Sequence, residues 1–128
     1  MVIDADKNKS LHSKNEDQVR EMASLTKIMT ALVSIMLVKE LDLNMSNTYF
    51  TVGRSSAGCC GTTAFLVADQ KVKIIDLLYA LMLPSGNDAA LTLAENFGRL
   101  MRTLKRIGPK KDRQRPPFFT WLLHPCGH

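Results

Sequence analysis

Two short groups of polar residues could carry out nucleophilic chemistry, and the first is Ser24-Leu25-Thr26-Lys27. Residues three apart in a helix lie on the same face, so the Ser24 hydroxyl and the Lys27 amine would be neighbours. A serine attacks a carbonyl when a base takes its proton, and a lysine can be that base when desolvation and nearby charge lower its pKa. The spacing predicts Ser24 as nucleophile and Lys27 as base. The bare pattern also fits, and more often reflects, a helix cap beside a lysine that extends to water.

The second group is Ser85-Gly86-Asn87, on a turn between two apolar segments. The Ser85 hydroxyl could pass a proton between the lysine and a leaving group, and the Asn87 side chain could bind a substrate amide and the lysine together. Taken alone, this group is typical of a turn followed by a helix cap. The presence of both groups in one chain is what favours an acyl-transfer site.

The elements that would position these groups follow from the spacing of apolar residues. A helix is expected from about residue 24 to 41, and it is apolar almost all round between Ile28 and Val38, which is typical of a helix buried inside a domain. The other expected elements are a hairpin formed by residues 1–3 and 11–13, a strand at 49–52, a loop at 53–61, a helix from 72 or 73 to 83, and a helix at 89–97 that Asn87 or Asp88 caps and Gly98 ends. This pattern predicts an α+β fold that is mainly helical.

The composition is that of a globular chain, with 128 residues, of which 45% are hydrophobic and 23% charged. The net charge of +5 is concentrated in residues 99–115, which hold eight basic residues against Asp112 alone. The rest of the chain is slightly acidic, so its charge gives no case for nucleic-acid binding. We therefore expect a domain at residues 1–98 and a basic, proline- and aromatic-containing tail at 99–128 that is poorly ordered.

Three cysteines, two of them adjacent, do not form a disulfide framework. The segment His124-Pro125-Cys126-Gly127-His128 has metal-ligand residue types but is a weak metal site, and no metal or cofactor is predicted. No apolar segment reaches the roughly 20 residues that span a bilayer. The first residues lack the apolar core of a secretory signal, so this sequence does not predict a compartment.

Together, Ser24-Leu25-Thr26-Lys27 and Ser85-Gly86-Asn87 match the Ser-x-x-Lys and Ser-x-Asn motifs of penicillin-binding proteins and serine β-lactamases. Over residues 1–98 the sequence resembles the D-alanyl-D-alanine carboxypeptidases, which are the low-molecular-mass penicillin-binding proteins. The segments that carry this resemblance are Val2–Ala5, Leu11–Asn15, Ala23–Leu32, Gly61–Ala64, Asp76–Leu83 and Ser85–Ala90.

The resemblance implies the helical part of a β-lactamase/transpeptidase-like fold, with a short N-terminal β-hairpin and most of the family sheet missing. It implies Ser24 as the acylated nucleophile, Lys27 as general base, Ser85 as proton relay and Asn87 as a ligand of substrate and lysine. It also implies a metal-independent hydrolase of the cell envelope, which cleaves peptidoglycan stem peptides ending in D-Ala-D-Ala through an acyl-enzyme and is trapped by β-lactams.

One family motif is missing, because the sequence contains no Lys-Thr-Gly downstream of Ser85. The segment Arg106-Ile107-Gly108 is a poor substitute and lies too close to Ser85. We therefore expect this chain to have impaired activity or none. A β-lactamase is less favoured, because no glutamate is placed to activate a deacylating water. The alternative from another class is a non-catalytic binding module, or pseudoenzyme, whose basic tail at 99–128 contacts an anionic partner.

Overall fold

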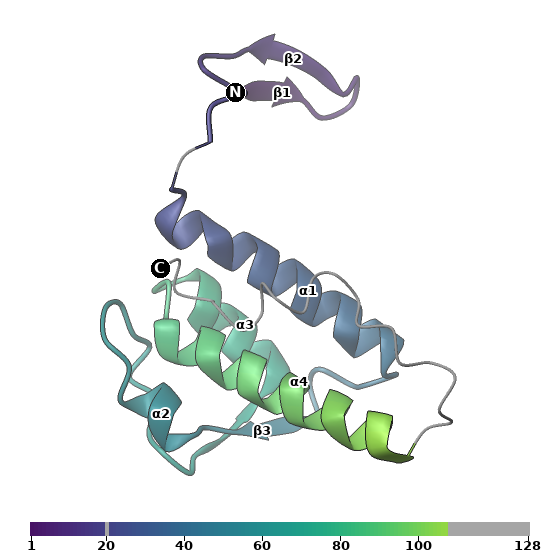
Figure 1. Ribbon diagram of the computed structural model, residues 1–128, viewed down its shortest axis with the longest axis vertical. Helices are drawn as coiled ribbons and strands as arrows, with labels where there is room; N and C mark the ends of the chain where they lie inside the picture. The colour runs from purple at the N-terminus through teal and green to yellow at the C-terminus, as the bar shows by residue number, and fades with distance from the viewer. Residues whose placement is uncertain (20, 108–128) are drawn as a thin grey trace.

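The computed structural model of the chain describes residues 1–19 and 21–107. The predicted tail beyond Ile107, including the candidate metal segment at 124–128, lies outside these residues. The described chain consists of a β-hairpin and a helical body to which a small sheet is attached (Figure 1). This confirms the predicted α+β class.

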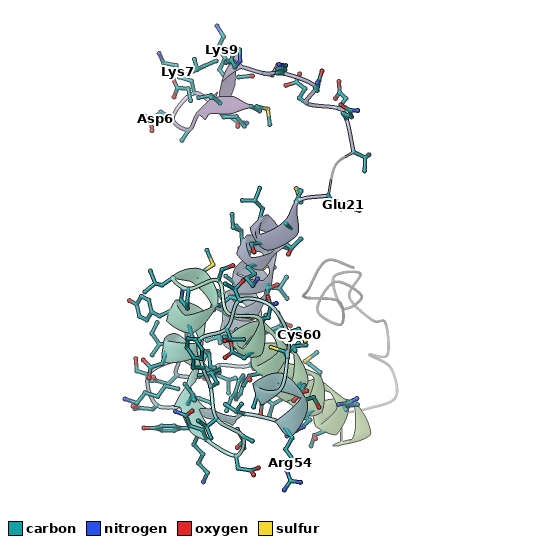
Figure 2. The ribbon with its side chains drawn as sticks, turned by 90° about the vertical axis from the view of Figure 1, so that its left-hand side faces the viewer. Asp6, Lys7, Lys9, Glu21, Arg54 and Cys60 are labelled. Atoms are coloured by element: carbon teal, nitrogen blue, oxygen red, sulfur yellow. The ribbon has the colours of Figure 1, made fainter. Side chains whose placement is uncertain are left out.

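The hairpin at the N-terminus is formed by β1 (Val2–Asp4) and β2 (Lys9–His12), which pair antiparallel with Asp4 opposite Lys9. The Asp4 carboxylate accepts hydrogen bonds from the backbone N–H groups of Asp6 and Lys7, which stabilises the turn. The predicted hairpin is confirmed. It lies apart from the helices in both views (Figures 1 and 2).

The long apolar helix is α1 (Thr26–Glu40), and a short 3₁₀ turn, η1 (Ala23–Leu25), precedes it. Its extent agrees with the prediction within one turn. The expectation that it is buried all round is wrong. Val33, Leu37 and Val38 are buried, whereas the side chains along the other face are 46–55% exposed, namely Ile28, Met29, Leu32 and Met36. The described residues cover only one side of α1.

The second sheet pairs β3 (Tyr49–Thr51) with β4 (Lys71–Lys73) in antiparallel register, and its central pair, Phe50 opposite Val72, is buried. The strand at 49–52 is confirmed, whereas residues 72 and 73, the predicted start of a helix, belong to β4. A three-residue strand is too short to show a period. The predicted loop at 53–61 contains one helical turn, α2 (Arg54–Ala57).

The two remaining helices are α3 (Ile74–Met82), as predicted, and α4 (Asn87–Ile107). The predicted end of the last helix at Gly98 is wrong, because α4 continues through it. An interior glycine costs a helix about 1 kcal/mol, and Leu100 and Met101 beyond it pack partly against the core, which offsets this cost. Residues 99–107 of the predicted tail are thus helical, and the domain boundary after residue 98 stays a prediction.

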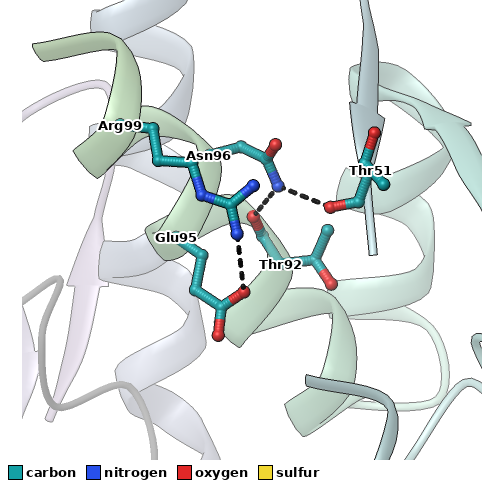
Figure 3. Close-up of polar contacts among 5 residues, drawn as sticks. All are labelled: Thr51, Thr92, Glu95, Asn96 and Arg99. Carbon is teal, nitrogen blue, oxygen red and sulfur yellow. Dashed lines mark hydrogen bonds and ion pairs between the residues drawn. The ribbon is translucent and has the colours of Figure 1, made fainter. Parts of the chain in front are cut away.

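The core lies where α4 contacts α1, α2, α3 and β3. The Phe97 ring of α4 is fully buried and packs edge-to-face on Phe50 of β3, with ring centroids 4.9 Å apart. At the preceding residue, the Asn96 side chain donates hydrogen bonds to the carbonyl oxygens of Thr51 in β3 and Thr92 in α4, at 2.9 and 2.8 Å (Figure 3). These contacts fix α4 against the sheet and so set the position of its N-terminus.

Candidate active site

Ser24 and Lys27 lie close together at the start of α1. The Lys27 Nζ is 3.5 Å from the Ser24 Oγ, which is the long end of hydrogen-bonding distance. Ser24 is exposed in η1, whereas Lys27 is only 5% exposed. Catalytic hydrogen bonds are often long before substrate binds, so this separation suits a nucleophile and its base.

The alternative of a helix cap beside a surface lysine does not fit this geometry. The cap position of α1 is Leu25, and no side-chain cap bond is made there. Lys27 does not extend to water either, because its residue is almost completely buried. Burying an ammonium group costs free energy unless a polar partner is present, and the partner here is the Ser24 hydroxyl.

Ser85 lies on the tight turn that joins α3 to α4. Its φ is +59°, in the left-handed region that costs a residue with a side chain about 1–2 kcal/mol. The next residue, Gly86, donates its N–H to the Ala80 carbonyl at 3.1 Å. A Cβ on Gly86 would lie 2.7 Å from the Ala80 carbonyl oxygen and 2.7 Å from Asp88 Oδ1. The turn therefore requires glycine beside Ser85, and it holds the serine half-buried in a strained conformation.

Asn87 is held by a loop that lies far from it in the sequence. Its Nδ2 donates to the Cys60 carbonyl at 2.9 Å, and its backbone N–H donates to the Thr62 carbonyl at 2.7 Å. Gly61 between them has a φ of +89°, and a Cβ there would lie 2.6 Å from Asn87 Nδ2. The side-chain amide of Asn87 is therefore oriented by residues 60–62.

Asp88, predicted only as a possible helix cap, supports the site through its carboxylate. It does accept the Ala89 N–H at 2.9 Å. Its carboxylate is 1% exposed and also accepts the N–H groups of Ala64 and Leu66, each at about 2.9 Å. Ala64 and Leu66 are more than 20 residues from Asp88 in the sequence, so no local pattern predicts these two bonds. The only signal in the sequence is the Asn-Asp pair before a helix. Asp88 thus fixes the same loop that orients Asn87.

The two predicted groups lie at the same end of the helical body. α1 contacts both α3 and α4, and the N-terminal ends of α1 and α4 are on the same side in Figure 1. Within residues 1–19 and 21–107, no hydrogen bond joins Ser24 or Lys27 to Ser85 or Asn87. The structure therefore pairs Ser24 with Lys27 directly, and places the Ser85–Asn87 turn at the end of the helices where that pair lies.

No group of three or more His, Cys, Asp or Glu side chains in the described part of the chain could hold a metal ion. Nor does any helix formed by residues 1–19 and 21–107 have the length and apolar character needed to cross a membrane.

Sequence comparison identifies relatives for most of the chain. A profile of the D-alanyl-D-alanine carboxypeptidases matches residues 1–99. The D-alanyl-D-alanine carboxypeptidase of Streptomyces sp. (strain K15) is 35% identical over 105 residues, which cover 77% of this chain and 34% of that protein. The enzyme DacF of Bacillus subtilis (strain 168) is 30% identical over 95 residues, covering 74% of this chain and 24% of its own length.

Solved structures give the same result. The D-alanyl-D-alanine carboxypeptidase DacD of Francisella tularensis superposes with a TM-score of 0.70 and 32% identity over 83% of this chain and 27% of that one. Penicillin-binding protein 5 of Haemophilus influenzae superposes with a TM-score of 0.65 and 28% identity, over 94% of this chain and 36% of that one. The chain thus has part of the β-lactamase/transpeptidase-like fold, as predicted, and spans about a third or less of the length of these relatives. With the profile match over residues 1–99, this places the chain in the D-alanyl-D-alanine carboxypeptidase family.

Proposed function

We propose that this chain carries the acylation machinery of a serine-type D-Ala-D-Ala carboxypeptidase, with Ser24 as the residue that becomes acylated. The observation that carries this proposal is the buried Lys27 side chain, whose Nζ lies 3.5 Å from the Ser24 Oγ. A lysine buried beside a serine hydroxyl is an arrangement that suits nucleophile activation. The family to which residues 1–99 belong supports the same reaction.

In the proposed mechanism, Lys27 in its neutral form takes the proton of Ser24, and the Ser24 Oγ attacks the carbonyl carbon of the penultimate D-alanine. The terminal peptide C–N bond then breaks. Ser85 relays the proton from the lysine to the leaving nitrogen, and D-alanine departs. Water later hydrolyses the ester on Ser24. Asn87, whose amide orientation is fixed by the Cys60 carbonyl, binds the substrate amide and the lysine.

The proposed substrate is a peptidoglycan stem peptide, and the proposed site of action is the cell envelope, both by analogy with the family. β-Lactams would react with the same serine, because their strained amide places a carbonyl carbon where the peptide carbonyl would lie.

The missing Lys-Thr-Gly motif limits the expected rate. In the family, the strand that carries this motif supplies an oxyanion-hole donor, and the loss of one such donor costs about 10²–10³ in rate. None of the 128 residues form the motif. We therefore expect acylation that is slow and detectable by a single-turnover measurement, with little or no turnover of peptide.

The test is intact-mass spectrometry of the full chain after incubation with benzylpenicillin. The expected result is one covalent adduct, located on Ser24 by peptide mapping. Ser24→Ala should abolish it, whereas Ser55→Ala, which changes an exposed serine of α2, should not. An adduct that persists in Ser24→Ala would overturn the proposal, as would the absence of any adduct on a chain that circular dichroism shows to be folded.

The role of Lys27 is tested with Lys27→Met, which keeps an unbranched apolar side chain in the buried position. Acylation should fall by at least about 10²-fold, the usual contribution of a general base. Lys39→Met changes an exposed lysine on the same helix and should leave the rate unchanged. Equal rates for the two variants would remove Lys27 from the mechanism.

The binding-module alternative depends on the basic tail at 99–128. Most of that tail lies outside the described residues, so the alternative stays a prediction. If the alternative is correct, removing residues 99–128 should abolish binding of an anionic partner, and removing only 108–128, which holds four of the eight basic residues, should weaken it. Neither effect requires acylation of Ser24.

A further inference from the structure

The loop that orients Asn87 contains two adjacent cysteines, Cys59 and Cys60. Cys60 is exposed, and Figure 2 shows it on the helical body, away from the hairpin. Cys59 is half-buried and follows the short helix α2. The proposed mechanism uses neither thiol. What it uses is the Cys60 main-chain carbonyl, which accepts the Asn87 Nδ2 at 2.9 Å.

We propose that Cys59 and Cys60 are a redox modification site: low-molecular-mass disulfides oxidise them to a vicinal disulfide, which releases the Asn87 side chain from the Cys60 carbonyl. The proposal deepens the proposed function, and its effect on acylation rests on that function. The oxidation of the two sulfurs does not depend on the proposed function.

The oxidation proceeds by two thiol–disulfide exchanges. The exposed Cys60 thiolate attacks one sulfur of oxidised glutathione, which forms a mixed disulfide and expels one glutathione thiolate. The Cys59 thiolate then attacks the Cys60 sulfur, which forms the Cys59–Cys60 bond and expels the second glutathione thiolate. The two protons lost by the cysteines end on the two glutathiones, and the two electrons reduce the glutathione disulfide. An accessible thiol beside a resolving cysteine is the usual arrangement of redox-sensitive sites.

Closing this bond must change the backbone around Cys60. Adjacent Cα atoms across a trans peptide are about 3.8 Å apart, whereas disulfide-bonded cysteines usually have Cα atoms about 4.4–6.8 Å apart. The small ring therefore forms only with altered torsions at both cysteines, and the Cys60 carbonyl turns with them. A strained, exposed disulfide is also readily reduced, so the modification is reversible.

The loop has little freedom to absorb such a change without moving Asn87. Gly61 already has a φ of +89° and lies against the Asn87 amide, where a Cβ would come within 2.6 Å of Nδ2. On its other side, Thr62 accepts the Asn87 backbone N–H at 2.7 Å. Rotation of the Cys60 carbonyl thus removes the acceptor of the Asn87 side chain and strains the contact that holds the first turn of α4.

The experiment treats the full chain with oxidised glutathione and follows it by intact mass, amide hydrogen exchange and benzylpenicillin acylation. The expected product is 2 Da lighter, by the loss of two hydrogens. Exchange of the Asn87 N–H should accelerate. Acylation of Ser24 should slow by about tenfold, the rate equivalent of one lost hydrogen bond. Dithiothreitol should reverse all three changes.

Variants identify the bond and separate the possible failures. Cys126→Ser should still lose 2 Da, whereas Cys59→Ser and Cys60→Ser should not. If Cys126→Ser no longer loses 2 Da, the bond is made to Cys126 and the proposal is overturned. The proposal is also overturned if the oxidised chain exchanges the Asn87 N–H at the same rate as the reduced chain. If benzylpenicillin fails to react even with the reduced chain, the proposed function fails, and the mass and exchange measurements still decide whether the dithiol releases Asn87.

Discussion

The buried carboxylate of Asp88 accepts the backbone N–H of Ala64, 24 residues earlier in the chain, at 2.9 Å. It accepts the Leu66 N–H at the same distance. Between these two residues, Phe65 has a φ of +58° and is almost fully exposed, a strained conformation for a bulky residue. A charged acceptor buried at the start of α4 thus maintains a loop conformation that the loop sequence does not favour by itself.

We therefore expect Asp88→Ala to destabilise the fold by about 3 kcal/mol, because the backbone N–H groups of Ala64, Leu66 and Ala89 lose a buried carboxylate acceptor. Asp76→Ala is the matched control, since Asp76 is also acidic and in the first turn of a helix, α3, but is exposed. Its loss should cost only about 0.3–1 kcal/mol, from the helix dipole. Guanidinium unfolding followed by circular dichroism measures both, and equal costs would contradict the importance of the loop bonds.

The parts of the fold that the sequence predicted are those specified by neighbouring residues. The hairpin, α1 and α3 follow from turn residues and apolar spacing within each segment. The end of α4 could not be predicted, because the glycine penalty at Gly98 is local whereas the packing of Leu100 and Met101 that outweighs it is tertiary. The exposed face of α1 could not be predicted for a related reason. An apolar pattern shows which faces avoid water in a whole domain, and the described residues cover one face only.

The same distinction applies to the site. The pairing of Ser24 with Lys27 follows from helical spacing, and the structure brings the two together. The contacts of Asn87 with Cys60 and Thr62 span more than 20 residues and left no periodic signal. The roles of the four site residues stay predictions until acylation is measured.

Substitution by alanine should have opposite effects on stability at Gly98, inside α4, and at Gly86, in the turn before it. Gly98→Ala should stabilise the protein by about 0.5–1 kcal/mol, because alanine favours a helix and the nearest atom to its Cβ, on the flexible Arg102 side chain, is 4.0 Å away. Gly86→Ala should destabilise it by about 2–3 kcal/mol, because its Cβ meets a backbone carbonyl at 2.7 Å. Thermal unfolding of both variants checks the pair. Destabilisation by Gly98→Ala would mean that α4 does not continue through this residue.

The Asn96 side chain gives a test of how α4 is fixed to the sheet (Figure 3). Asn96→Asp removes the donor to the Thr51 and Thr92 carbonyls and places a carboxylate against them, so we expect a loss of about 2–4 kcal/mol. Asn44→Asp is the control, because the Asn44 side chain accepts from the backbone N–H groups of Ser46 and Asn47 and a carboxylate can do the same. Urea unfolding should show a loss for the first variant and almost none for the second.

Ser85 should show a conflict between stability and function. Its φ of +59° favours glycine, so Ser85→Gly should be about 1 kcal/mol more stable than Ser85→Ala, which keeps the strained Cβ. Both variants lack the hydroxyl of the proton relay, so both should acylate about 10²-fold more slowly with benzylpenicillin. Unfolding and acylation measured on the same samples separate the two effects. If Ser85→Gly acylates as fast as the unchanged chain, the hydroxyl is not the relay, and the strain at this position then serves the shape of the turn alone.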